Sequence, residues 1–165
     1  MTLPPQLPIQ LRKSRKTDVR SQFAALCFRM NEGEVEFCLV TSRGTGRWIT
    51  PKGWPMHNQT PADAAATEAW EEAGLTGVAY DRCLGVFSYL KPLNRVTAAV
   101  VCMLYPVEVT HEHAKWPERK QRKRQWFTRE EAAAAVAEKE LKAIIMGFDP
   151  ETLKQPVATP LNTAG

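Results

Sequence analysis

Short apolar runs separated by polar, turn-forming residues dominate the chain, and their lengths are typical of strands. Residues 21–29 (S-Q-F-A-A-L-C-F-R) and 35–41 (V-E-F-C-L-V-T) are two such runs, with the turn-forming segment 30–34 (M-N-E-G-E) between them. A basic loop that contains glycine, residues 42–47, follows the second run. We therefore expect the folded part to begin with two strands joined by a turn.

A further strand pair is predicted after the middle of the chain. Residues 77–90 form one or two strands with a bend at Gly85, and residues 91–95 (K-P-L-N-R) form a turn. Residues 96–109 are then the hairpin partner. The segment 96–105 is nearly all apolar, which is typical of a central strand covered on both faces.

The segment 61–73 has the composition and the flanking residues of a helix. Alanines fill its interior, Thr60 is the expected N-cap, Pro61 suits the first position and Gly74 is the expected stop. Asp63 is placed to interact with the positive end of the helix dipole. This helix follows the loop that begins near Trp48.

A second helix is predicted over residues 129–146, after a short strand at residues 125–128. Thr128 is its expected cap, with Glu131 at the capping-box position, and Gly147 ends it. The order of elements is then strands, loop, helix, strands and long helix. That order fits an α/β fold in which a mixed sheet lies between helices.

Both ends of the chain lack these patterns. Residues 1–18 combine prolines with a basic cluster, and residues 149–165 combine prolines with polar residues. We expect an irregular basic arm and a loose tail on either side of one folded domain, residues 19–148. A chain of 165 residues is long enough for one domain with a substantial core.

Charge and cysteine content narrow the class of protein. The net charge of +4 and the pI near 9.0 suit an anionic ligand but do not require one. No apolar run approaches the length of a membrane span, and the first residues lack the apolar region of a signal peptide. The cysteines lack C-x-x-C spacing and lie among apolar residues, so we expect buried free thiols in a cytoplasmic protein: Cys27, Cys38, Cys83 and Cys102.

The predicted first helix carries the residues with the clearest chemistry. Glu68, Glu71 and Glu72 have i, i+3, i+4 spacing and share one helix face, where like charges repel. Carboxylate oxygens are the ligands that Mg²⁺ prefers, so a divalent cation would turn this repulsion into a binding site. A solvated acidic helix face is the alternative interpretation of the same three residues.

The segment from Gly53 to Leu75 resembles the Nudix box, G-x5-E-x7-R-E-U-x-E-E-x-G-U, where U is a bulky aliphatic residue. Counted from Gly53, the final three glutamates and both glycines are in register. Two positions depart, because the first box glutamate is Gln59 and the box arginine is Thr67. In the family these two side chains hold the loop against the helix as an acid–base pair. Here both charges are absent together, which leaves no unpaired charge.

The resemblance extends over roughly residues 20–146, and it implies a Nudix-type α/β/α sandwich. The segments A-A-L-C-F-R, R-W-I-T-P-K-G-W and R-K-R-Q-W-F-T-R-E-E-A are similar to the branch that hydrolyses diphosphoinositol polyphosphates and diadenosine polyphosphates. The implied activity is hydrolysis of a phosphoanhydride bond in a small anionic metabolite. The implied cofactor is Mg²⁺, with Mn²⁺ as an alternative.

The resemblance also implies roles for particular residues. The glutamates Glu68, Glu71 and Glu72 would bind metal, and one of them would take the proton of the attacking water. The carbonyl of Gly53 and a more distant glutamate, either Glu112 or Glu118, would complete the metal site. Loop cations would contact the substrate phosphates: Arg43, Arg47, Lys52, Arg95, Lys123 and Arg124.

Three alternatives remain, and the last two belong to other functional classes. The first is a pyrophosphatase acting on nucleoside diphosphate sugars such as ADP-ribose, and the second is a Nudix module that binds a nucleotide without cleaving it. The third is an RNA-binding or RNA-decapping protein, suggested by the basic segment 115–124 with Trp116 and Trp126. A solvated charged segment and a core position for Trp126 explain that pattern more simply. We therefore expect a small-molecule substrate, no nucleic-acid partner, no membrane partner, and a monomer or homodimer.

Overall fold

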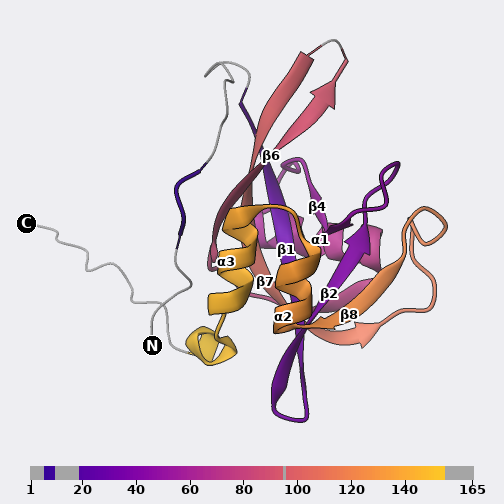
Figure 1. The fold of residues 1–165 in the computed structure, drawn as a ribbon. Coiled ribbons are helices and arrows are strands. Elements are labelled where there is room, and N and C mark those ends of the chain that lie inside the picture. The colour runs from indigo at the N-terminus through magenta and orange to yellow at the C-terminus, as the bar shows by residue number, and fades with distance from the viewer. Residues whose placement is uncertain (1–5, 10–18, 95, 155–165) are drawn as a thin grey trace, which may run out of the picture.

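The computed structural model describes residues 6–9, 19–94 and 96–154, which form one sheet flanked by helices (Figure 1). The strands are β1 (Arg20–Asn31), β2 (Glu34–Thr41), β3 (Trp48–Ile49), β4 (Lys52–Gly53), β5 (Leu75–Ala79), β6 (Gly85–Leu93), β7 (Val96–Glu112) and β8 (Arg124–Thr128). The helices are α1 (Pro61–Ala73), α2 (Arg129–Ala135), α3 (Lys139–Gly147) and the 3₁₀ helix η2 (Pro150–Lys154).

The sheet is mixed, as the sequence predicted. Its main order is β3-β2-β1-β7-β5, while β4, β6 and β8 pair with β1, β7 and β2 respectively. The central strands β1 and β7 run parallel, and the other pairs are antiparallel. The parallel pair at the centre is buried on both faces, which is the ordinary situation of parallel strands.

Side chains alternate between the two faces of β1, and each face packs against different helices. Leu26 and Phe28 belong to one apolar cluster, together with residues of α2 and α3. Ala25 and Cys27 belong to a second cluster, together with the alanines of α1. A period of two residues along a strand places successive side chains on opposite faces. The sheet therefore lies between α1 and the pair α2–α3, and the predicted α/β/α sandwich is confirmed (Figure 1).

Helix α1 begins and ends where the sequence predicted. The Thr60 hydroxyl accepts a hydrogen bond from the Asp63 N–H at 3.2 Å, and Pro61 occupies the first turn. Gly74 ends the helix in a left-handed conformation, with φ of 66°. A Cβ at Gly74 would also lie 2.7 Å from the Trp116 ring, so both backbone conformation and packing favour glycine there.

The single helix predicted over residues 129–146 is wrong, because the chain forms α2 and α3 with a break between them. The expected Thr128 cap is present, since its hydroxyl accepts from the Glu131 N–H at 3.3 Å. Val136 and Glu138 are extended, with ψ of 154° and 125°. Val136 packs in the core, and that tertiary contact overrides the helical preference of the surrounding alanines.

Three further boundaries differ from the prediction. Strand β6 continues to Leu93, so the predicted turn at residues 91–95 is too long, and β7 continues to Glu112. The predicted loose tail begins with η2, in which Leu153 is buried in the core. These segments gain order from packing and strand pairing between distant parts of the chain, which local composition does not reveal.

The cysteines are free thiols, and the expectation of burial is correct for three of them. Cys27, Cys38 and Cys102 are buried, whereas Cys83 is exposed on the link between β5 and β6. Burial raises the pKa of the Cys38 thiol to about 12, which keeps it protonated and unreactive. None of the described helices is both long and apolar enough to cross a membrane.

Candidate active site

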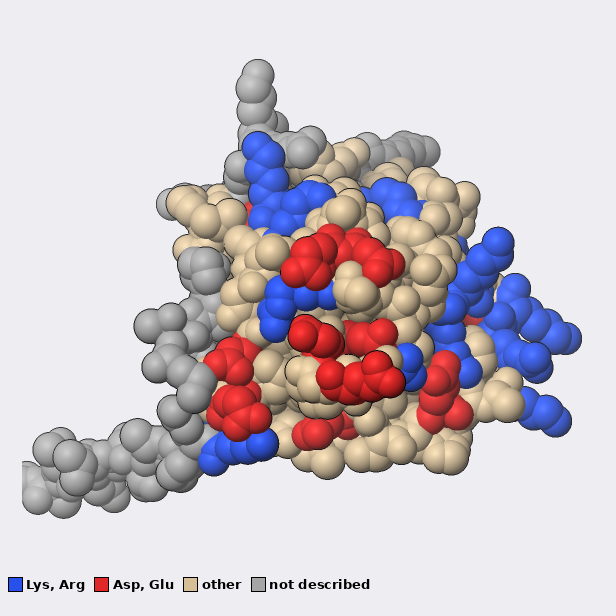
Figure 2. Space-filling view, turned by 60° about the horizontal axis from the view of Figure 1, so that its bottom comes forward, with Lys and Arg blue, Asp and Glu red and all other residues tan. Residues whose placement is uncertain are grey.

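Charges of both signs share the face of the molecule drawn in Figure 2. Acidic side chains gather near the centre of that face, and Lys and Arg side chains lie beside them. This face is therefore not a continuous basic surface of the kind that a nucleic-acid backbone requires. The two tryptophans of the RNA-binding alternative also have internal partners. Trp116 donates its indole N–H to the Glu72 carbonyl at 3.1 Å, and Trp126 packs against the core.

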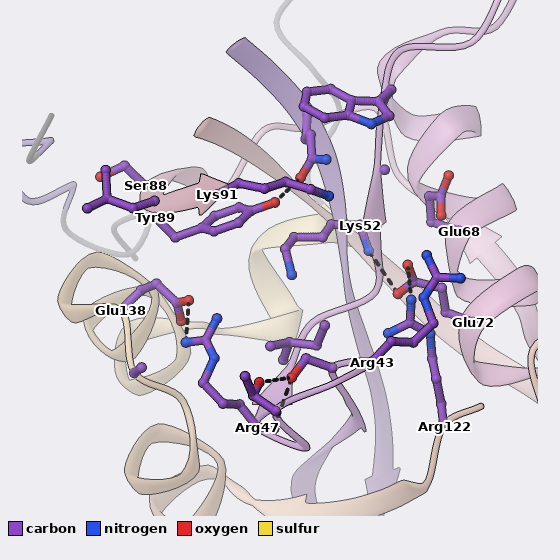
Figure 3. A pocket seen from close by; sticks show the side chains of 18 of the residues that line it. Arg43, Arg47, Lys52, Glu68, Glu72, Ser88, Tyr89, Lys91, Arg122 and Glu138 are labelled. Atoms are coloured by element: carbon purple, nitrogen blue, oxygen red, sulfur yellow. Dashed lines mark hydrogen bonds and ion pairs between the residues drawn. The ribbon is translucent and has the colours of Figure 1, made fainter. Parts of the chain in front are cut away.

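A pocket of about 1060 Å³ brings together segments that are distant in the sequence. It is lined by the acidic face of α1, by β4, by β6, by the loop 42–47 and by the link between α2 and α3. Figure 3 shows Glu68 and Glu72 on one side of this pocket, with Arg47 and Glu138 on the other. The volume is at the upper end of the range for small-molecule sites.

All three glutamates of α1 line this pocket, and two of them are buried. Burial, together with the charges of Glu71 and Glu118, raises the pKa of Glu68 from 4.5 to about 7. Burial also raises the pKa of Glu72 to about 7, although Arg122 and Lys52 oppose that shift. The ionised form of these two carboxylates is therefore disfavoured in the absence of an added cation.

The backbone of β4 lies directly against these carboxylates. The Lys52 N–H donates to Glu72 Oε2 at 3.3 Å. At Gly53 a Cβ would lie only 2.1 Å from Glu68 Oε1, so this position requires glycine. The spacing between Gly53 and the glutamates thus has a steric cause, since the strand must approach the helix without a side chain between them.

Arg122 is the site residue that the sequence did not single out. Its side chain is 6% exposed, and its Nη2 lies 3.1 Å from Glu72 Oε1 and 3.3 Å from Glu118 Oε1. Its Nη1 also donates to the Thr41 carbonyl at 3.0 Å. Six cations lie between residues 115 and 124, and only the fold shows which one enters the acidic cluster.

The donor set fits a hard divalent cation, although the side chains are not arranged around one. Among the described residues, no three acidic, histidine or cysteine side chains are already placed to hold a metal ion. The glutamates nevertheless offer only oxygen ligands and lie on one helix face. Burial and mutual repulsion raise the pKa values of Glu68 and Glu72. A divalent cation would relieve that repulsion. The pair of Glu72 with Arg122 shows that the cluster already holds one positive charge.

The structure separates the two candidates for the additional glutamate. Glu118 lines the pocket, and its charge acts on both Glu68 and Glu72. Glu112 lies in another cluster, where its Oε1 is 3.2 Å from Arg124 Nε and its Oε2 accepts from the Trp126 indole at 3.2 Å. Glu118 is therefore the candidate ligand that the fold supports.

Three of the six predicted substrate-binding cations line the pocket. Arg43 donates to Gln121 Oε1 at 3.0 Å and is largely exposed. Arg47 Nη1 lies 3.5 Å from Glu138 Oε1. The Lys52 ammonium lies 4.9 Å from the centre of the Tyr89 ring, and burial lowers its pKa. These cations line the same pocket as the carboxylates of α1.

The other three cations are not part of the described pocket. Arg124 donates to the Ala73 carbonyl at 2.8 Å and stacks on Trp116, so it closes the end of α1 rather than contacting a ligand. Lys123 is exposed, and its N–H donates to the Thr41 hydroxyl at 2.9 Å. Arg95 lies outside the described residues. For Lys123 and Arg124, position within a basic segment of the sequence does not place a side chain in the pocket.

The two departures from the Nudix box lie in contact. The Thr67 hydroxyl is 3.2 Å from Gln59 Oε1 and 3.0 Å from the Asp63 carbonyl, and it has one proton to donate. A neutral contact thus occupies the place of the acid–base pair. The loop before α1 keeps a side-chain link to the helix.

The family model for the Nudix domain matches residues 20–147 of the chain. The chain is 36% identical over 128 residues to human diphosphoinositol polyphosphate phosphohydrolase 3-beta, covering 76% of this chain and 74% of that protein. It is 34% identical over 103 residues to the mitochondrial Nudix hydrolase 12 of Arabidopsis thaliana, covering 60% of this chain and 51% of that protein. The match thus spans about half the length of the plant relative.

Among solved structures, the fold is similar to that of the Ap4A hydrolase of C. elegans. The TM-score is 0.57 at 19% sequence identity, and the match covers 79% of this chain and 96% of the other. At that identity the likeness supports the fold alone.

Proposed function

The chain belongs to the Nudix domain family, and from this membership and the geometry of the pocket we propose that it is a metal-dependent phosphoanhydride hydrolase. The observation that carries the proposal is that the glutamate face of α1, with Glu68 and Glu72 buried, lines one pocket together with three cations: Arg43, Arg47 and Lys52. Diphosphate hydrolysis needs both kinds of group, because carboxylates bind the cationic metal ion and basic side chains bind the anionic substrate.

Each group has a defined task in this proposal. Glu68, Glu71 and Glu72 would hold Mg²⁺ or Mn²⁺, with the Gly53 carbonyl and Glu118 as further ligands. A bound divalent cation supplies Lewis-acid charge to the phosphate oxygens and favours deprotonation of water. One carboxylate of the triad accepts the proton of the attacking water. The three cations bind the remaining phosphate oxygens and orient the diphosphate.

The substrate classes follow the relatives and the charge of the pocket. We propose a diadenosine polyphosphate or a diphosphoinositol polyphosphate first, since phosphohydrolases of the second type are among the relatives above 30% identity. A nucleoside diphosphate sugar such as ADP-ribose is the second candidate. A module that only binds nucleotide is less well supported, because it has no need for three carboxylates with a cation preference.

Residues 19–148 are proposed as the catalytic domain, acting as a monomer or homodimer in the cytoplasm. The plant relative is named as mitochondrial, so the cellular location is a separate question for experiment.

Glutamine substitution tests the metal-dependent mechanism. The double variant Glu71→Gln/Glu72→Gln should lower kcat at least about 100-fold on a panel of diphosphate compounds with Mg²⁺ or Mn²⁺, because both metal charge and proton transfer are lost. Glu130→Gln removes an exposed carboxylate of α2 outside the pocket and serves as the control. Full activity of the double variant, or full wild-type activity in excess chelator, would reject the proposed function.

A further inference from the structure

The carboxylate of Glu138 lies across the pocket from Glu68 and Glu72 of the triad (Figure 3). Glu138 is at the link between α2 and α3 and is 8% exposed. Its Oε1 has Arg47 Nη1 at 3.5 Å, and its Oε2 is buried without a hydrogen-bond partner among the described residues. Figure 3 shows Glu138 beside Arg47, on the side away from Glu68 and Glu72. A buried carboxylate oxygen without a donor is costly, so its presence in a pocket wall points to a donor from a ligand.

Arg47 forms an ion pair with Glu138, and its side chain also lines the pocket. Its side chain is 42% exposed. It ends a loop in which Gly44 and Gly46 both have positive φ, outside any helix or strand. The same arginine faces the pocket, where a substrate phosphate would compete with Glu138 for it. When Arg47 turns to a phosphate, both oxygens of Glu138 need hydrogen-bond donors, because an ionised carboxylate only accepts.

We propose that Glu138 accepts hydrogen bonds from a hydroxyl or amino group on the non-phosphate part of the ligand. The inference rests on the proposed function and narrows its substrate to nucleoside-bearing diphosphates. A nucleoside offers ribose hydroxyls and, in adenosine, an amino group, and all of these are donors. A fully phosphorylated inositol ring presents only anionic oxygens at the same place, which a carboxylate repels. Glu138 is thus a specificity-determining residue.

An exposed aromatic side chain in the same pocket supports a nucleoside ligand. Trp54 lines the pocket and is 40% exposed, which is unusual for so large an apolar group. Its ring has the Lys91 ammonium 5.4 Å from its centre. A flat base would bury this indole by stacking, whereas an inositol ring covered with phosphates has no apolar face for it.

A simpler role for Glu138 is to orient Arg47, and the two roles predict different specificity. If Glu138 only orients the arginine, its loss should resemble the loss of Arg47. Arg47 contacts phosphate, which every candidate substrate carries, so its loss weakens them all. Loss of an acceptor for hydroxyl or amino donors weakens the binding of only those ligands that carry such donors.

The experiment compares kcat/KM for diadenosine tetraphosphate and for a diphosphoinositol pentakisphosphate, with Mg²⁺. The wild type should prefer the diadenosine compound. Glu138→Gln should lower the ratio of the two kcat/KM values about tenfold to hundredfold, since it removes a charge-assisted acceptor and introduces an amide donor facing phosphate. Arg47→Gln should lower both values together and keep the ratio within about threefold. The matched control Glu130→Gln should change neither value.

Either of two results would overturn the proposal. One is an unchanged ratio in Glu138→Gln, and the other is a parallel loss on both substrates that matches Arg47→Gln. A melting curve checks that the variant is folded. Where it is not, Glu138→Asp withdraws the carboxylate while keeping its charge, and a lowered ratio is again required.

The proposed function and the proposed subsite can be rejected by different results. If the wild type cleaves neither compound nor any other diphosphate, the hydrolase proposal is rejected. The subsite is then judged by calorimetric binding of ADP and of inorganic diphosphate. Glu138→Gln must weaken binding of ADP about tenfold or more relative to diphosphate. Equal affinities for ADP in the variant and the wild type would overturn the subsite.

Discussion

At the level of single side chains, the pocket combines ion pairs such as Arg122–Glu72 with carboxylates that repel one another. Glu68 and Glu72 are buried, and Arg122 forms an ion pair with Glu72. A buried carboxylate pays for its desolvation unless a partner compensates it. Desolvation of the glutamates raises the free energy of the protein without a bound cation, so cation binding is favoured. That free energy depends on pH.

The first prediction concerns Glu68 in the metal-free protein. Its pKa is raised from 4.5 to about 7 on folding. The folded state therefore binds more protons than the unfolded state between these values, and stability falls as pH rises from about 4.5 to about 7. Glu68→Gln should stabilise the metal-free protein at pH 8 by about 1–2 kcal/mol, or roughly 3–6 °C in Tm, and by less at pH 5.

Melting curves in chelator at the two pH values provide the measurement. Glu130→Gln gives the general effect of removing one exposed negative charge. A stabilisation of Glu68→Gln that is equal at both pH values, or larger at pH 5, would contradict the burial argument. Added Mg²⁺ should reverse the order at pH 8, since the wild type then gains a ligand that the variant binds less well.

At the level of elements, helix α1 combines packing and chemistry on different faces. Its alanines pack closely against the sheet, and its glutamates meet the backbone of β4. The contact between the glutamates and β4 requires the loop between β4 and α1 to keep a fixed conformation. The contact of Thr67 with Gln59 links the loop to the helix, in the position where the family has a charged pair.

The second prediction is that these two positions are energetically coupled. Thr67→Arg alone places a cation beside a neutral partner and loses the hydroxyl contact, so it should destabilise the protein. Adding Gln59→Glu supplies the missing charge. Because both side chains are partly exposed, we expect a coupling of about 0.5–1 kcal/mol in a double-mutant cycle measured by urea unfolding. Strictly additive effects of the two substitutions on the free energy of unfolding would contradict the predicted coupling.

At the level of the whole molecule, the pocket exists because the sheet order brings distant segments together. The loop 42–47 follows β2, the triad lies on α1, and Glu138 follows α2. These segments are unrelated in sequence position, and each contributes one or more charges to the same cavity. Substrate affinity should therefore depend on position in the fold rather than on local charge density.

The third prediction compares cations inside and outside the pocket. Arg43→Gln and Arg47→Gln should each raise KM for a diphosphate substrate about tenfold, because each loses a charge-assisted contact. Lys123→Gln removes the same charge from an exposed position outside the pocket and should change KM less than about twofold. Steady-state kinetics at fixed ionic strength separate these outcomes. A larger effect of Lys123→Gln than of both arginine variants would show that the basic segment 115–124 binds the substrate.

The sequence by itself determined the features that depend on local chemistry. Capping residues fixed both ends of α1, because Thr60 and Gly74 satisfy backbone groups within one turn of themselves. Alternating and continuous apolar runs identified the central strands, and helical spacing placed Glu68, Glu71 and Glu72 on one face. The positions of Gly53 and Gly74 relative to these glutamates carried the family resemblance. Each of these inferences uses residues that lie close together in the chain.

Only the tertiary structure decided which distant residues meet. Arg122 and Arg124 are two residues apart, yet one enters the acidic cluster and the other closes the end of α1. Glu118 lines the pocket and Glu112 does not, because successive parts of the segment after β7 turn toward different neighbours. The break between α2 and α3 arises where Val136 packs in the core and Glu138 turns to the pocket. Such choices depend on packing free energy summed over several elements, and local patterns do not contain it.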